Sequence, residues 1–308
     1  MSEESSRLAW SDEQWATVQQ VVQNAARLAR VASSFLPLHG PLAPGQATVP
    51  ALSMTSPELL DRQRGEAQER LVIDEGATLR LTTIACDVYL TTQQAQDPDL
   101  AVARDLLGRA ADVTGRLEDA IVFNGQPGVD SAPLKADGAP VVVPPIYTVR
   151  NAGPNPGLLT PFGIGGPEGP TKTVSWGKGD EGGQALVEAI VGAIQELEGR
   201  GHYGPFACVL GRTLYLVANT PNRGSLVLPS DRIIPFLSGP LLRSSTVPDD
   251  QGVVVALAAA PIDLVVGTDV HASFVQLSVE PRYVLRVSER FVLRMKQPDA
   301  VCQLRLQP

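Results

Sequence analysis

The chain has 308 residues, of which 44% are hydrophobic and 19% are charged, and its formal net charge at pH 7 is -8. This length and composition suffice for one large domain or two modest ones with a packed core. The acidic balance, without a cluster of Lys and Arg, argues against a protein that coats nucleic acid. No apolar run reaches the roughly 18 to 20 residues that span a bilayer, so we expect a soluble, cytosolic chain.

Neither the cysteines nor the histidines have the spacing of metal ligands. Each cysteine is set in an apolar or strand-like run, which favours buried free thiols. We therefore expect no metal and no cofactor. The residues concerned are Cys86, Cys208, Cys302, His39, His202 and His271.

The first predicted element is a helix over residues 11–31. Ser11 and Gln14 have the spacing of a capping box, and Trp10 and Trp15 occupy the two positions of a hydrophobic staple. Apolar residues then recur at spacings of three and four, so one side of the helix should pack. Prolines and glycines between residues 35 and 44 end it and form a connector.

Residues 46–90 are interpreted as an extended arm. The stretch 48–70 has no sustained apolar period, whereas the β-branched and aromatic residues of 72–90 suit strands. The simplest picture is a long two-stranded arm with a charged tip. The charged residues of the tip are Glu58, Asp61, Arg62, Arg64, Glu66, Glu69 and Arg70.

The longest segment with consistent helical signals covers residues 97–125. Asp97 suits the N-cap, Pro98 the first helical position, and Asn124 with Gly125 the left-handed stop. A stripe of apolar residues predicts that one face packs on a core. The opposite face carries alternating charges from Arg104 to Asp119, including Asp112 and Arg116, and we expect it to be solvated.

The middle of the chain, residues 126–180, is dense in Gly and Pro and is interpreted mostly as loop, with 151–173 as an insertion. Glycines at 179–183 lead into a helix over 184–197. This turn lacks the Lys and the glycine spacing of a phosphate site, so a plain helix start is favoured. A buried strand over 206–210 follows, which makes an α/β unit.

The last third is predicted to be mainly β. Short helical or irregular pieces are expected over 213–217 and 233–237, with a loop over 219–230 between them. Strands are expected over 253–260, 262–266, 273–279, 283–287 and 290–295, with turns at 267–269 and 280–281.

Several motifs resemble the shell proteins of the encapsulin family. EDAIVFNG at residues 118–125 is similar to the end of the family's spine helix, and GPFACVL at 204–210 to its GPYALVL strand. DLVVGTD at 263–269 resembles the family's D-(L/F)-x-L-V-x-G-x-D run. Residues 289–294 and 298–300 resemble its E-x-F-x-(F/L) and PEA ending.

The resemblance implies an α+β fold of the tailed-phage major capsid type and a closed icosahedral shell that encloses cargo enzyme in the cytoplasm. It implies an N-terminal arm with a lumen-facing helix (1–45), an extended loop (46–90), a peripheral domain (91–135 and 256–308) and an axial domain (136–255). The implied partners are many copies of the chain and a cargo protein with a targeting peptide. Neither nucleic acid nor membrane is expected.

The resemblance also implies roles for particular residues. In the family, a similarly placed tryptophan-containing helix faces the interior and helps to form the groove for cargo peptides, although packing on its own domain is an equally good interpretation here. The charged arm tip would reach over a neighbouring subunit, and the loop near the fivefold axis would line a pore. The groove residues would be Trp15, Val18, Val21, Val22, Ala25, Leu28 and Phe35, and the pore loop Asn219, Thr220, Pro221, Asn222, Arg223 and Gly224.

No catalytic arrangement is visible, and we predict that the chain is not an enzyme. A GxSxG elbow is absent, and the adjacent Glu118 and Asp119 point about 100° apart on a helix, so they cannot share one proton. A phage or prophage coat protein and an unrecognised α/β enzyme remain alternatives. A shell would be a very large particle, whereas an enzyme would usually form a small closed oligomer.

Overall fold

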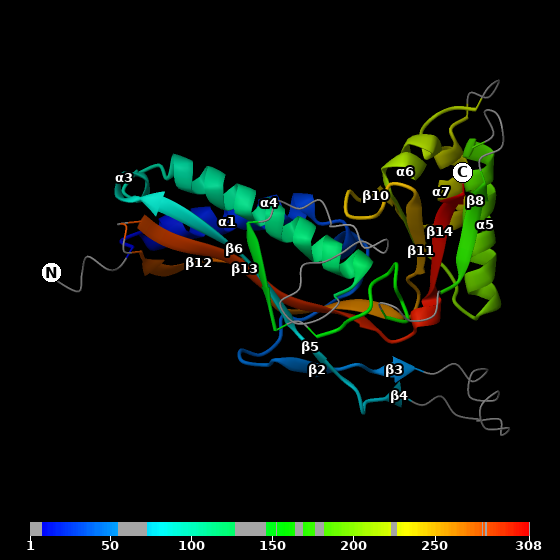
Figure 1. Cartoon of the computed structure of the whole chain (residues 1–308), viewed down its shortest axis with the longest axis horizontal. Helices are drawn as coiled ribbons and strands as arrows, with labels where there is room; N and C mark the ends of the chain where they lie inside the picture. Colours follow the sequence, from blue (N-terminus) through cyan, green and yellow to red (C-terminus); the bar gives the residue numbers. More distant parts are fainter. Residues whose placement is uncertain are drawn as a thin grey trace.

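The computed structural model describes residues 8–54, 73–126, 146–151, 153–163, 169–175, 182–222, 227–278, 280 and 282–307. These residues form two five-stranded sheets with helices packed on them, and a narrow two-stranded ribbon beside the first sheet (Figure 1). The mixture of helices and mainly antiparallel strands confirms the predicted α+β class.

Helix α1 (Asp12–Ala29) begins as the sequence predicts. Ser11 and Gln14 form the capping box in both directions, with N–O distances of 3.2 and 3.0 Å. The staple residues form an aromatic pair: the rings of Trp10 and Trp15 lie edge to face with centroids 5.0 Å apart. Trp10 also donates its ring N–H to the carbonyl oxygen of Ala95 at 2.8 Å, which ties the helix start to α3 (Thr92–Ala95).

The long helix α4 (Ala101–Asn124) starts later than predicted. The N-cap is Leu100 and not Asp97 as predicted, although Oδ2 of Asp97 accepts a hydrogen bond from the N–H of Ala101, the first helical residue, at 3.1 Å. The prediction that Pro98 occupies the first helical position is wrong, since a turn intervenes in which Leu100 has a φ of 50°. The predicted stop is confirmed by Gly125, whose φ is 81°.

Helices α1 and α4 pack closely because two glycines of α4 face α1. A β-carbon on Gly115 would lie 3.0 Å from Cβ of Ala29 and 3.1 Å from the carbonyl oxygen of Ala26. One on Gly108 would lie 3.4 Å from the side chain of Val21. Helix α1 packs alongside α4 and also contacts β12 of the first sheet.

The first sheet has the strand order β1 (Leu38–His39), β12 (Ile262–Leu277), β13 (Arg282–Met295), β6 (Thr82–Thr91) and β7 (Tyr147–Arg150). All neighbours are antiparallel except β1 and β12. Each of β12 and β13 is one long strand where the sequence predicts two short ones. The predicted turn at 267–269 is wrong: β12 bulges there, with register shifts on both sides of Thr268, and turn-type residues also suit a bulge.

The second sheet has the order β10 (Leu241–Arg243), β9 (Phe206–Leu210), β11 (Gln251–Ala256), β14 (Val301–Gln307) and β8 (Thr171–Ser175). Helix α5 (Gly182–Gly199) packs on it, with α6 (Arg212–Ala218) and α7 (Pro229–Leu237) alongside. The sheets do not follow the ranges expected from the resemblance. β6, most of which falls in the range of the extended loop, is an inner strand of the first sheet, so only residues before it can belong to an arm. β1, from the N-terminal arm range, and β7, from the axial range, also join the first sheet, whereas β14, which directly follows the short helix η3 (Pro298–Ala300), joins the second.

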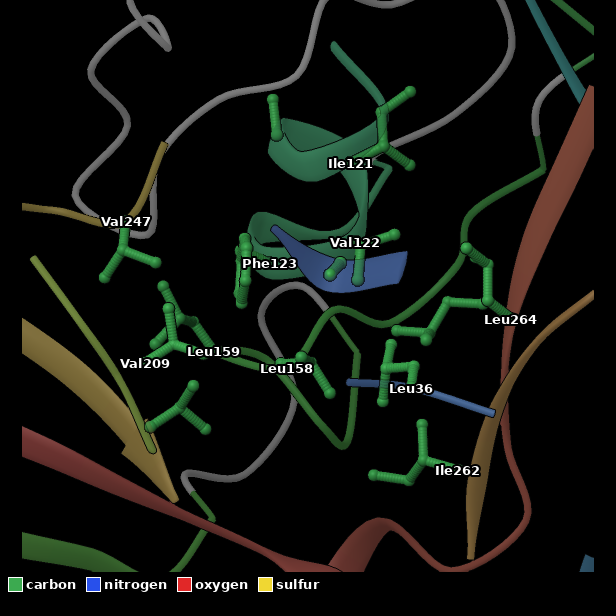
Figure 2. Packing of buried hydrophobic residues seen from close by; sticks show 14 of the residues in the cluster. Leu36, Ile121, Val122, Phe123, Leu158, Leu159, Val209, Val247, Ile262 and Leu264 are labelled. Atoms are coloured by element: carbon green, nitrogen blue, oxygen red, sulfur yellow. The ribbon is translucent and has the colours of Figure 1, made fainter. Parts of the chain in front are cut away.

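Part of the presumed insertion lies in the core. The backbone N–H groups of Leu158 and Leu159 donate to the carbonyl oxygens of Val122 and Phe123 at 2.9 and 2.8 Å, so they satisfy the end of α4. Both leucine side chains are buried among residues of α4, β9 and β12 (Figure 2). A side chain at Gly157 would clash with the backbone N of Gly125, which requires glycine there.

The ribbon consists of two short antiparallel pairs, β2 (Thr48–Pro50) with β5 (Thr78–Arg80) and β3 (Ser53–Met54) with β4 (Ile73–Asp74). It is the base of the predicted arm (Figure 1). The seven charged residues of the arm tip lie outside the described residues, so their contacts remain a prediction. The three cysteines are free and buried, as predicted.

Within the described ranges, no helix is both long and apolar enough to cross a membrane.

Candidate functional site

A cavity of about 460 Å³ lies where the end of α1 meets the first sheet. We call it the α1 cavity. Its apolar wall comes from the linker after α1 and from β12, and its polar wall from the last turns of α1. Two glutamates, Glu118 of α4 and Glu289 of β13, also line it. The apolar wall contains Leu38, Pro41, Leu264, Val266 and Val270, and the polar wall Gln23, Arg27 and Arg30.

The cavity exists because α1 stops abruptly. Arg30 is extended, and the next residues enter the short helix η2 (Ala32–Ser34). Asp119 of α4 holds this corner: its carboxylate accepts hydrogen bonds from the N–H groups of Val31 and Ala32 at 2.8 to 3.0 Å. The chain then pairs with β12 and turns at Gly40, whose φ is 130° and where a side chain would clash with the carbonyl oxygen of Val266.

The prediction that Asp119 belongs to a solvated face is wrong, because residues of the α1–η2 corner cover it. Burial raises the pKa of Asp119 to about 7, although the N–H donors of Ala32 and Val31 oppose this shift. The charged residues of α4 that precede Glu118 in the chain, from Arg104 to Arg116, do lie at the surface. Arg116 and Asp112 form a partly exposed ion pair with an N–O distance of 3.2 Å, at the helical spacing that the sequence shows.

Arg30 forms ion pairs with three carboxyl groups, one each from α4, β12 and β13. Its Nε lies 2.6 Å from Oε2 of Glu118, its Nη2 lies 2.7 Å from Oε1 of Glu289, and its Nη1 lies 3.1 Å from Oδ1 of Asp269. Glu118 and Glu289 are fully buried, whereas the side chain of Asp269 is 60% exposed. Burial lowers the pKa of Arg30, but attraction from Glu118, Glu289 and Asp269 outweighs it and raises the pKa.

The expected groove residues mostly pack within their own subunit. Val18, Val22 and Phe35 are buried, and Trp15, Val21 and Ala25 are partly buried. Leu28 is 84% exposed and borders a second hollow between α1, α4 and residues near β10. None of the seven lines the α1 cavity. Their role in cargo binding remains a prediction.

Sequence reasoning missed the cluster of Arg30, Glu118 and Glu289. Each glutamate opens one of the motifs that resemble the encapsulin family, which is the one signal that could have pointed to them. Helical and strand periodicity could not, because the three residues are brought together only by the packing of α1, α4 and β13.

Four residues of the expected pore loop are described, and Arg223 and Gly224 lie outside the described residues. Asn219 and Thr220 end α6: the side chain of Asn219 donates to the carbonyl oxygen of Tyr215 and that of Thr220 to Leu216. Pro221 and Asn222 follow, and the pore role of the loop remains a prediction. In the part of the chain that the structure describes, no group of three His, Cys, Asp or Glu side chains could hold a metal ion.

Sequence comparison matches residues 163–292 to a family model described as an encapsulating protein for peroxidase. The chain is also 27% identical over 299 residues to the type 1 encapsulin shell protein EncA of Myxococcus xanthus (strain DK1622), a match that covers 95% of this chain and 92% of that protein. Both matches agree with the resemblance of the sequence motifs to encapsulin shell proteins. Another encapsulin relative is a diheme-cytochrome-encapsulin shell fusion protein of Kuenenia stuttgartiensis, 26% identical over 97% of this chain and 75% of that protein.

Solved structures show the same fold at low sequence identity. A virus-like particle from Pyrococcus furiosus matches with a TM-score of 0.62 at 13% identity, over 95% of this chain and 100% of that one. The capsid of Myoviridae phage XM1 matches with a TM-score of 0.56 at 12% identity, over 89% and 91% of the two chains. The expected capsid-type fold is thereby confirmed.

Proposed function

We propose that the chain is the self-assembling subunit of a closed icosahedral shell that encloses a cargo protein in the cytoplasm. The observation that carries this proposal is the breadth of the match: it spans 92% of the M. xanthus shell protein and nearly all of this chain. The role is structural, and the fold that the chain shares with capsid subunits supports it.

Exposed apolar side chains on the second sheet's helices agree with assembly. Leu216 of α6 and Ile234 and Phe236 of α7 are exposed in the isolated chain, as is Tyr203 in the segment before β9. Contacts with another molecule are a common reason for exposed apolar surface. Neighbouring subunits would cover these side chains in a shell.

Electron microscopy of the purified chain tests assembly directly. We expect uniform hollow spheres, and mass photometry of the same sample should give one very large species. A monodisperse species below about ten chains would contradict the proposal and favour an enzyme-like oligomer. A phage coat is the alternative, and spheres filled with DNA, detected by their ultraviolet absorbance ratio, would favour it.

We further propose that the α1 cavity forms part of the groove that receives a cargo peptide. Its size suits one or two apolar side chains, and its wall combines apolar residues with a few polar groups, as ligand sites commonly do. Leu38, which lines it, is 59% exposed and available to a peptide. Many such sites on one inner wall would retain a multimeric cargo even if each binds weakly.

Substitution of Leu38 by Gln tests the groove. Shells from the source organism would first be analysed by mass spectrometry, and the copurifying protein would then be coexpressed with each variant. We expect Leu38→Gln shells to form normally and to carry several-fold less cargo. Leu106→Gln is the matched control, since Leu106 is an exposed leucine of α4 outside the cavity lining. Undiminished loading in Leu38→Gln shells would move the groove elsewhere, with exposed Leu28 as the next candidate.

A further inference from the structure

Two glutamates from distant parts of the chain meet below the end of α1. The side chains of Glu118 and Glu289 are both 0% exposed, and both contact the guanidinium group of Arg30. Nε and Nη2 form one edge of the planar guanidinium of Arg30 and lie 2.6 and 2.7 Å from the two carboxyl groups. The two carboxyl groups, which we call the carboxyl pair, therefore lie side by side in the core.

A single arginine cannot satisfy the pair in its doubly ionised form. Asp269 also binds Arg30, so three carboxylates would compete for one positive charge. Asp269 is largely solvated, but the carboxyl pair is not. Among the described residues, none of the four oxygens of the pair has a hydrogen-bond donor in good geometry. Two buried carboxylates in contact are strongly unfavourable, whereas one proton between them supplies the missing donor.

We propose that Glu118 and Glu289 share one proton, and that this proton holds the end of α1 against α4 and the first sheet. The proton lies between one oxygen of each carboxyl group while Arg30 binds the pair. Arg30 directly follows α1, so its side chain anchors the corner that leads into η2 and the wall of the α1 cavity. Loss of the proton leaves two adjacent carboxylates, which repel each other and loosen this corner. This role of the shared proton does not depend on the proposed cargo groove.

The direction of the pH dependence follows from the environment of the pair. Burial raises the pKa of Glu118 to about 7, and burial together with the neighbouring Glu118 raises the pKa of Glu289 well above its ordinary value. In the unfolded chain a glutamate titrates near pH 4.3, so the folded state binds more protons above about that pH. The stability that the pair contributes is complete below about pH 4.3 and is lost as the pH rises through the folded pKa values.

The other charged groups around the pair do not reverse this direction. Arg30, whose pKa is raised by the neighbouring carboxylates, keeps its charge throughout the range, and Arg27 lies on the same α1 side of the cavity. Asp269 of β12 contacts Arg30 from the solvent side. Asp119 of α4 has a pKa raised by burial, so its titration acts in the same direction.

Hydrogen exchange of the intact protein, with and without Glu289→Gln, tests the proposal. The amide of Gln has the shape of a protonated carboxyl group and can donate a hydrogen bond to Glu118 without titrating. In the wild type we expect backbone exchange over residues 26–36, corrected for its intrinsic pH dependence, to accelerate as the pH rises from about 4.3 to the folded pKa values of the pair, by up to about tenfold per pH unit for one proton. Above those values the corrected rate should level off. In Glu289→Gln the acceleration at the same amides should be clearly smaller, because the proton of the pair no longer titrates and only Asp119 still contributes.

Infrared spectroscopy provides a second readout that does not depend on a variant. The carbonyl stretch of a protonated carboxyl group should be present in the wild type at neutral pH and weaker in Glu289→Gln. Asp269→Asn is the matched control, since it removes a solvated partner of the same arginine and should leave the pH dependence of exchange unchanged. If Glu289→Gln does not fold, Glu118→Gln makes the same test from the other side. A wild type without this infrared band at neutral pH, or a Glu289→Gln variant whose exchange still accelerates like that of the wild type, overturns the proposal.

Discussion

At the scale of single residues, buried charges in this chain are held by partners far away in sequence. Asp263 of β12 accepts hydrogen bonds from Nε and Nη2 of Arg294 at 2.8 and 2.6 Å, and Nζ of Lys296 lies 3.1 Å from its Oδ2. Asp263 and Arg294 are directly opposed in the β12–β13 pairing. The bidentate contact therefore fixes the register of the two longest strands as well as satisfying both charges.

Removal of the Asp263 charge should be costly. Asp263→Asn leaves the buried guanidinium of Arg294 without its counter-ion, and we expect a loss of about 3 to 5 kcal/mol in the free energy of unfolding. Urea denaturation at matched protein concentration measures it. Asp112→Asn is the control, because its partner Arg116 is partly exposed and the loss should be below about 1 kcal/mol.

At acidic pH, the wild type and Asp263→Asn should differ less in their free energy of unfolding. Burial raises the pKa of Asp263, but Arg294 and Lys296 together lower it by more than burial raises it. The pKa of Asp263 therefore lies below its ordinary value. The stabilisation is thus present above the unfolded pKa of about 3.9 and is lost as the pH falls through the folded pKa. Equal stability of the two proteins at neutral pH would contradict this account.

At the scale of elements, α4 organises the chain because each of its parts is covered by a different segment. The glycines Gly108 and Gly115 let α1 approach closely along its length. Its C-terminal carbonyl groups, which no helix can satisfy internally, receive the N–H groups of Leu158 and Leu159. Asp119 near that end holds the corner after α1. The helix therefore joins the two sheets and the α1 cavity in one packed unit.

At the scale of the whole molecule, the ribbon is the part least able to stay folded without contacts to other segments. An isolated two-stranded hairpin is marginal in water, and here each paired segment has only two or three residues. Its base is nevertheless attached to the first sheet. Val49 packs in a small cluster with Leu81, Val265 and Val292, and the N–H of Met54 donates to the carbonyl oxygen of Lys296 at 2.8 Å. The base should therefore persist without the arm tip.

Deletion of the arm tip should separate folding from assembly. Met54 and Ile73 are directly paired, so residues 55–72 can be replaced by a two-residue Asn-Gly turn without moving the base. We expect a folded subunit by circular dichroism and a shift from shells to small species by size-exclusion chromatography. Replacement of only the seven charged tip residues by Ser is the comparison that separates charge from chain contact. Intact shells of unchanged thermal stability after the deletion would show that the arm is not a fastening between subunits.

The sequence by itself determined the features whose cause lies within a few residues. The capping box of Ser11 and Gln14, the stop at Gly125 and the buried strand over residues 206–210 each depend on local hydrogen bonds or periodicity, and each was predicted correctly. The capsid-type fold was also predicted, but only through motifs that resemble a known family, since periodicity contains no information on how sheets and helices are connected.

Only the tertiary structure decided what covers each element. The helical period shows that Glu118 and Asp119 point in different directions, but whether each is solvated or buried depends on Arg30, Ala32 and Glu289, which belong to other segments. In the same way, Gly and Pro marked residues 153–163 as a loop, although the amides of this loop complete the end of α4 in the core. Charge and turn signals describe a residue's own preferences, whereas burial is decided by whichever distant segment packs over it.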